Sequence, residues 1–213
     1  MILDENLFNF TGRIGDYVVY WYRGKKCIRK RPKAPKGPPT PGMVTQQKRM
    51  QSASIFYHAL KKAGIYPYWQ KAAEGKVENG YNLITKVNMS AFDGEGQICD
   101  FTKLHPTPRL LASPNGMTLS PTGDSMWKLT WKNSPNTGCT GDEDLLQVLL
   151  MRDNRSFALK PADTGGARRK DGEALIKVPE ELENYVHLFA FFCSEADGKC
   201  SESRYFYLLT SNF

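Results

Sequence analysis

The sequence is short of the residues on which most enzymes and metal proteins depend. Its three histidines, His58, His105 and His187, lie in separate segments, and its five cysteines lack Cys-x-x-Cys spacing. Neither a zinc site nor a disulfide scaffold is indicated, although Cys193 and Cys200 could face each other across a hairpin. A nucleophile elbow, a phosphate-cradling Gly-rich loop and a His-Glu-x-x-His motif are also missing. We expect a protein that is not an enzyme and that holds no metal and no cofactor.

Long apolar runs and an amino-terminal signal are lacking as well. No 18-residue apolar stretch occurs, and residues 1–6 carry acidic rather than basic side chains. We therefore expect a cytoplasmic protein with no membrane partner. Asp142, Glu143 and Asp144 form an acidic cluster that could bind a cation, but a solvated loop is the favoured interpretation. A carboxylate-pair hydrolase leaves no local motif and stays an open alternative.

What the sequence does have is a local excess of positive charge. The chain of 213 residues has a net charge of +7, and eight Lys or Arg with no Asp or Glu fall between Arg23 and Lys36. Like charges at this density repel one another unless something acidic neutralises them. The candidate polyanion-binding residues are Arg23, Lys25, Lys26, Arg29, Lys30, Arg31, Lys33 and Lys36. Acidic side chains of the same molecule are the alternative neutralisers, with candidates Asp142, Glu143, Asp144, Glu180, Glu181 and Glu183.

An aromatic β-hairpin overlaps the basic segment. Tyr17–Trp21 and Lys26–Lys30 are β-prone runs, and Gly24 between them can adopt the positive φ that a tight turn needs. Alternation along the first run places aromatic rings on both faces. The candidates for stacking on bases, or for packing against protein, are Tyr20, Trp21 and Tyr22. Because Lys and Pro also protect strand edges from aggregation, a solvated edge is the alternative.

Helices should follow a stiff connector. Prolines make residues 31–39 an extended arm, and Thr40 with Pro41 starts a helix that runs to Lys62 and stops at Gly64. Shorter helices are expected over Pro67–Glu74 and Gly80–Asn88, the second capped by Asn79. Trp21 is expected either to be buried under this helical cluster or to be exposed for stacking.

The rest of the chain has the period of β-strands. Apolar residues alternate or run continuously over Met126–Trp131, Leu145–Met151, Phe157–Leu159, Ala174–Val178, Val186–Cys193 and Arg204–Leu209, with turn signals between them. About seven short strands with an early Trp are typical of an immunoglobulin or fibronectin type III sandwich. The expected core includes Trp127, Trp131, Leu149, Ile176, Phe189 and Phe191.

These patterns predict an α+β fold in two domains. Residues 1–104 would hold the basic hairpin, the Pro-rich arm and the helical cluster. Residues 105–213 would form the C-terminal immunoglobulin/fibronectin-III-like β-sandwich.

Several short motifs carry a resemblance over nearly the whole chain. They are Gly12 with Gly15, Gly24-Lys25, Arg29 with Pro32, Thr40-Pro41 with Gln46 and Gln47, Gly80-Tyr81-Asn82-Leu83 and the strands around Ile176 and Phe189. The sequence resembles an uncharacterised family of small proteins abundant in Bacteroidota, some of them near mobile or prophage-like elements. This resemblance implies the same order of hairpin, arm, helix and strands, and it brings no assigned activity or ligand.

Two non-enzymatic functions fit these observations. The first is non-specific contact with nucleic acid or another polyanion through the hairpin and arm. The alternative is a structural or assembly protein, such as a component of a phage-like particle or scaffold, whose hairpin and arm contact a protein partner or a second copy in a homo-oligomer. Polyanion binding weakens as salt rises, whereas burial of aromatic rings does not.

Overall fold

The chain divides into two compact units, which we describe separately. The computed structural model describes residues 10–22, 24–33, 37–123, 126–133, 141–152, 157–178 and 186–208. The first unit is Met1–Thr40 and the second is Pro41–Phe213. Within the described residues there are three α-helices and three antiparallel sheets, so the predicted mixed α+β class is confirmed.

The first unit contains a three-stranded antiparallel sheet in the order β1-β2-β3. The predicted hairpin is present as β2 (Tyr17–Tyr22) and β3 (Lys25–Lys30), each one residue longer at the turn. Gly24 has a φ of 72°, the left-handed conformation that the turn needs. The additional strand β1 (Gly12–Ile14) pairs with β2. Three residues are too few to show a strand period, so the sequence did not predict β1.

The second unit begins with the three helices α1 (Pro41–Lys62), α2 (Tyr66–Ala73) and α3 (Gly80–Asn88). The predictions for α1 and α3 are confirmed, and α2 lies one residue earlier than predicted at both ends. The Asn79 carboxamide oxygen accepts a hydrogen bond of 2.8 Å from the backbone N–H of Asn82, which caps α3 as expected. No helix among the described residues is both long and apolar enough to cross a bilayer.

Two sheets follow the helices. One has the order β10-β9-β6-β7, with β11 also pairing with β9, and the other has the order β4-β5-β8. The strands are β4 (Asn115–Gly123), β5 (Met126–Lys132), β6 (Leu145–Met151), β7 (Leu159–Pro161), β8 (Glu173–Lys177), β9 (His187–Ser194), β10 (Lys199–Cys200) and β11 (Arg204–Tyr207). Most predicted strands are therefore present, and β4 was missed because Pro121 and its Ser, Thr and Gly residues resemble a loop.

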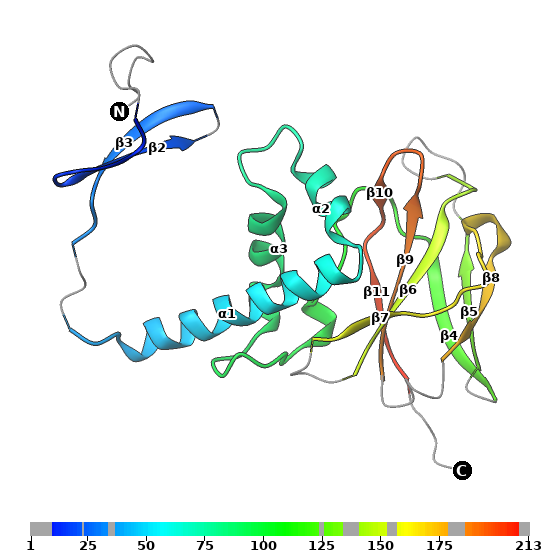
Figure 1. Cartoon of the computed structure of the whole chain (residues 1–213). Helices are drawn as coiled ribbons and strands as arrows, with labels where there is room; N and C mark the ends of the chain where they lie inside the picture. Colours follow the sequence, from blue (N-terminus) through cyan, green and yellow to red (C-terminus); the bar gives the residue numbers. More distant parts are fainter. Residues whose placement is uncertain are drawn as a thin grey trace. The chain divides into compact units, whose positions relative to one another are not determined.

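The sheet that contains β6 and β9 is covered on both faces (Figure 1). Alternate residues of β9, including Leu188, Ala190 and Phe192, pack with the β4-β5-β8 sheet in one core that also holds Trp127 and Trp131. The residues between them on β9 pack with the helices in a second core. That second core includes Phe56, Leu60, Trp69, Ile84, Leu149, Phe189 and Phe191.

The expected sandwich core is therefore partly wrong in its membership. Trp127, Trp131 and Ile176 do lie between the two sheets. Leu149, Phe189 and Phe191 are buried instead on the face that packs with the helices. A strand covered on both sides is apolar at every position, so its residues do not reveal which face each one occupies. The division predicted between residues 104 and 105 crosses this second core, and independent folding of residues 105–213 stays a prediction.

Candidate polyanion-binding surface

The three candidate stacking rings lie exposed at the turn end of β2. The exposed fractions of Tyr20, Trp21 and Tyr22 are 37%, 53% and 53%. Trp21 is therefore not covered by the sheet of its own unit. Side chains alternate between the two faces of a strand, so successive rings along β2 point to opposite faces of the sheet.

The strand register separates the sheet into two faces of different character. Residues directly opposite each other in an antiparallel pair share a face, and Arg13, Val18 and Arg29 lie opposite one another across the three strands. We call this the arginine face; its members are Arg13, Val18, Tyr20, Tyr22, Lys25, Cys27 and Arg29. We call the other the tryptophan face; its members are Ile14, Tyr17, Val19, Trp21, Lys26, Ile28 and Lys30.

Each face holds an aromatic ring beside a cation. On the arginine face, the Arg29 guanidinium carbon lies 5.5 Å from the centre of the Tyr20 ring. On the tryptophan face, the Lys26 ammonium lies 5.5 Å from the centre of the Trp21 ring. Such contacts stabilise by about 0.5–1 kcal/mol at exposed sites and orient both groups. The cations therefore help to hold the rings in place.

The eight candidate cations are not equivalent in the structure. Lys25, Arg29, Lys30, Arg31 and Lys33 are exposed, whereas Lys26 is only 5% exposed. Arg23 and Lys36 lie outside the described residues. In the described part of the first unit, no carboxylate forms an ion pair with any of the five exposed cations.

Arg13 also belongs to this surface, although it was not among the predicted cations. Arg13 is exposed and lies opposite Val18 on β2, which in turn lies opposite Arg29 on β3. It stands ten residues before the basic segment, so a count of charge along the chain does not include it. The turn at Gly15, with a φ of 50°, is the signal that could have placed it on the sheet.

Three of the acidic residues that could neutralise the arm have partners in the second unit. The Glu143 carboxylate pairs with Lys170 at 2.5 Å and with Arg168 at 2.8 Å, and these cations hold its pKa below the usual range. Asp142 accepts a hydrogen bond of 2.9 Å from the Asn133 side chain. Glu180, Glu181 and Glu183 lie outside the described residues.

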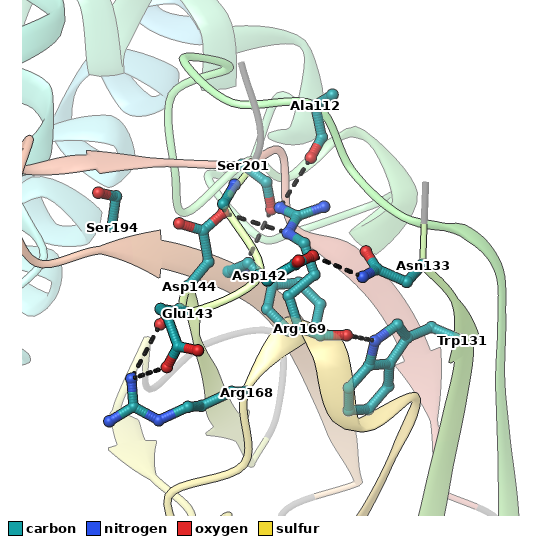
Figure 2. Close-up of polar contacts among 12 residues, drawn as sticks. Ala112, Trp131, Asn133, Asp142, Glu143, Asp144, Arg168, Arg169, Ser194 and Ser201 are labelled. Carbon is teal, nitrogen blue, oxygen red and sulfur yellow. Dashed lines mark hydrogen bonds and ion pairs between the residues drawn. The ribbon is translucent and has the colours of Figure 1, made fainter. Parts of the chain in front are cut away.

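The third residue, Asp144, is part of a buried ion pair with Arg169 (Figure 2). The side chain of Asp144 is 5% exposed and that of Arg169 is 0% exposed. Arg169 Nε donates a hydrogen bond of 3.1 Å to Asp144 Oδ2. Arg169 also donates to the Ala112 carbonyl at 2.9 Å, while its own carbonyl accepts from Trp131 Nε1 at 2.7 Å. Burial lowers the pKa of the Arg169 guanidinium, and the neighbouring carboxylates oppose that shift.

This arrangement gives Asp144 a structural role. A solvated loop was the favoured interpretation, and it is wrong for Asp144. Within the described ranges, no group of three or more His, Cys, Asp or Glu residues could hold a metal ion. Cys193 and Cys200 do face each other across a strand pair, as expected, and both are buried free thiols.

A family model covers the hairpin, the helices and both large sheets. It is described as a family of unknown function, DUF6266, and it matches residues 9–207. The chain belongs to DUF6266. Neither a curated protein nor a solved structure matches the chain. Since the DUF6266 match extends across the arm, the exposed sheet and the second unit are parts of one family pattern.

Proposed function

We propose that this chain is a non-enzymatic protein that binds nucleic acid without sequence specificity, through the arginine face and the arm that follows it. The observation that carries the proposal is the combination of exposed cations and exposed rings on one side of an open sheet. Arg13, Lys25 and Arg29 supply the charge, and Tyr20 and Tyr22 supply the rings. Lys30, Arg31 and Lys33 extend the positive charge along the chain.

Single strands fit this surface better than duplexes. Phosphate contacts by Lys and Arg release counterions and supply affinity. Exposed rings add stacking on bases, which contributes about 1–3 kcal/mol per base and is available only where bases are unpaired. Tyr20 and Tyr22 lie two residues apart on one face, so both can contact the same strand.

The test is fluorescence anisotropy with a labelled 20-nucleotide oligo(dT) across a salt series. We expect binding near 50 mM salt that weakens steeply as salt rises. In Arg13→Gln with Arg29→Gln, the slope of log affinity against log salt should flatten by about 0.7 for each phosphate that the variant no longer neutralises. The matched control is Lys61→Gln with Lys62→Gln, which removes two exposed cations from the end of α1.

Two outcomes would end this proposal. One is no retention of single- or double-stranded DNA or RNA by the wild-type protein near 50 mM salt, where such contacts are strong. The other is an equal loss of affinity in the arginine-face variant and the α1 control.

The tryptophan face supports a second candidate function, which is assembly with a protein partner or a second copy, as in a phage-like particle or scaffold. Ile14, Tyr17 and Trp21 leave exposed apolar surface there. The lysines of the edge strand β3 protect the edge of the sheet from pairing with a strand of another chain. Association by packing on the tryptophan face is therefore favoured over strand addition. Association through apolar burial would persist at high salt, and light scattering after size-exclusion chromatography measures it directly.

We also propose a fibronectin-III-like arrangement for the two large sheets. If β10 and β11 are counted as one interrupted strand, the described part of the two sheets contains seven strands, numbered from β4. The first, second and fifth of these (β4, β5 and β8) form one sheet, and the other four form the second. Immunoglobulin-type sandwiches likewise combine the first, second and fifth strands. The strand order supports this arrangement, and an experimental structure of the second unit tests it.

A further inference from the structure

The second unit contains a pocket that the nucleic-acid proposal does not use. It lies between α2, α3 and the segment of residues 105–110, and it has a volume of about 460 Å³. This volume is within the usual range for small-molecule sites, about 300–1,000 Å³. All of its lining residues belong to the second unit.

The wall formed by residues 105–110 is fixed by buried hydrogen bonds. The fully buried Asn88 side chain accepts from the His105 backbone N–H at 2.7 Å and donates to the His105 carbonyl at 3.1 Å. Trp69 Nε1 donates to the Pro106 carbonyl at 2.7 Å. Thr107 donates its hydroxyl to the Ser201 carbonyl at 2.8 Å. The pocket is therefore formed before any ligand arrives, which lowers the entropic cost of binding.

The lining combines an apolar wall with positive charge. Trp69, Leu83 and Val87 contribute apolar surface from the two helices. Lys76 and Arg109 contribute cationic side chains, and none of the described lining residues is acidic. Arg109 is paired with Glu202, whose carboxylate also lies 3.6 Å from His105 Nδ1.

His105 adds a polar group to the lining without adding a fixed charge. Burial lowers the pKa of its imidazole; the Glu202 carboxylate opposes that shift and the Arg109 guanidinium adds to it. A neutral imidazole can donate or accept one hydrogen bond at each ring nitrogen according to its tautomer.

We propose that this pocket binds an amphipathic organic anion: a carboxylate or sulfonate held by Arg109 and Lys76, on a ring or branched apolar body that packs against Trp69, Leu83 and Val87. None of the described lining residues offers a carboxylate to a cationic ligand. A wholly apolar ligand would pack against the apolar wall but would make no ionic contact with Arg109 or Lys76. It should therefore bind more weakly than the anion.

Two fluorescent probes of similar shape test the proposal in the full chain. They are 8-anilinonaphthalene-1-sulfonate, which carries the anion, and N-phenyl-1-naphthylamine, which lacks it. We expect the wild-type protein to bind the sulfonate more tightly. The double variant Arg109→Gln with Lys76→Gln should weaken sulfonate binding by about fivefold to tenfold, the effect expected when charged hydrogen bonds are lost at a partly open site. Its affinity for the amine should not change.

Val87→Trp supplies an independent test because it fills the pocket from a partly exposed position on α3. It should reduce binding of both probes without changing the circular dichroism of the protein. The background control is Trp21→Ser with Tyr22→Ser, which removes exposed rings from the other unit and should leave sulfonate binding unchanged.

Four results would overturn the proposal. The first is that the wild-type protein does not bind the sulfonate at about 100 μM probe. This concentration lies within the range of dissociation constants expected for small ligands, about micromolar to millimolar. The others are equal affinity for the two probes, unchanged sulfonate affinity in the charge variant, and loss of sulfonate binding in the background control. Each of these is separable from failure of oligo(dT) binding, because the two surfaces belong to different units.

Discussion

At the scale of single residues, the buried Arg169 guanidinium depends on one carboxylate. Asp144→Asn keeps the shape of that side chain but removes its charge. Because it leaves a buried cation unpaired, we expect a loss of about 3–5 kcal/mol in the free energy of unfolding. Urea denaturation followed by circular dichroism measures this loss.

Glu143→Gln is the matched control, because it changes the neighbouring carboxylate, whose pairs with Arg168 and Lys170 are exposed. Exposed ion pairs add little to stability, so the urea midpoint should hardly move. A double variant, Asp144→Leu with Arg169→Met, removes both charges and should be less destabilised than Asp144→Asn. Equal effects of Asp144→Asn and Glu143→Gln would contradict this account.

His105 gives the stability of the second unit a pH dependence. Burial lowers the pKa of this imidazole below its ordinary value of about 6.5. As the pH falls through 6.5, about the pKa of the unfolded chain's imidazole, the unfolded chain takes up a proton that the folded chain resists. The contribution to stability is therefore fully present above that pH and is lost below it.

His105→Gln should consequently lose less stability than the wild type between about pH 7.5 and pH 5.5, a window that brackets the ordinary His pKa. Urea midpoints at the two pH values measure the difference. His58→Gln, which removes an exposed imidazole from α1, is the control. If the His105 variant and the wild type lose the same amount, burial does not govern this titration.

Charge along the sequence did not distinguish the exposed cations from the buried ones. Arg168, Arg169 and Lys170 look alike as a basic run, and only the middle residue is buried. Its partner Asp144 is 25 residues away, and the Ala112 carbonyl, which accepts a further hydrogen bond from the guanidinium, is 57 residues away. Tertiary contacts of this kind leave no local pattern for a sequence to show.

At the scale of elements, the two tryptophans Trp21 and Trp131 lie in contrasting strands. Trp131 on β5 is 5% exposed and donates a hydrogen bond to the Arg169 carbonyl, whereas Trp21 on β2 is 53% exposed. Trp131→Ala should cost about 3–5 kcal/mol, because a large buried ring leaves a cavity. Trp21→Ala should change the melting temperature of the chain very little.

Thermal unfolding of the two variants, followed by far-UV circular dichroism, makes the comparison. A large destabilisation by Trp21→Ala would mean that its ring is covered in solution. That result would favour packing against protein, as in the assembly function of the tryptophan face, over an exposed ring.

Local chemistry predicted helix boundaries better than it predicted strand faces. Asn79 caps the start of α3, and Gly64, with a φ of 76°, follows the end of α1, so each of these two boundaries has a local cause. Strands β6 and β9 were predicted as apolar runs, and their burial on both faces explains why the runs do not alternate. The candidate surface was predicted through its charge, but its division into two faces required the register and the strand β1.

At the scale of the whole molecule, the first unit supplies the proposed nucleic-acid contact and the second supplies a conventional core. A fragment of residues 41–213 keeps both cores, since every described member of each lies within it. We expect this fragment to fold and to lose affinity for oligo(dT), because the arginine face and the arm are removed. If the fragment keeps full affinity for oligo(dT), the nucleic-acid site lies in the second unit and not on the arginine face.

The shared core decides what a shorter fragment should do. The sequence predicted that residues 105–213 form a separate domain, but Leu149, Phe189 and Phe191 pack with the helices of residues 41–88. Removing the helices would expose these side chains, and burial of each one stabilises the fold by about 1.5–3 kcal/mol. We therefore expect the 41–213 fragment to unfold cooperatively, and the 105–213 fragment to aggregate or unfold at a much lower urea concentration. If both fragments unfold at the same urea midpoint, the sequence-based domain boundary is correct and the helices are an addition to an independent sandwich.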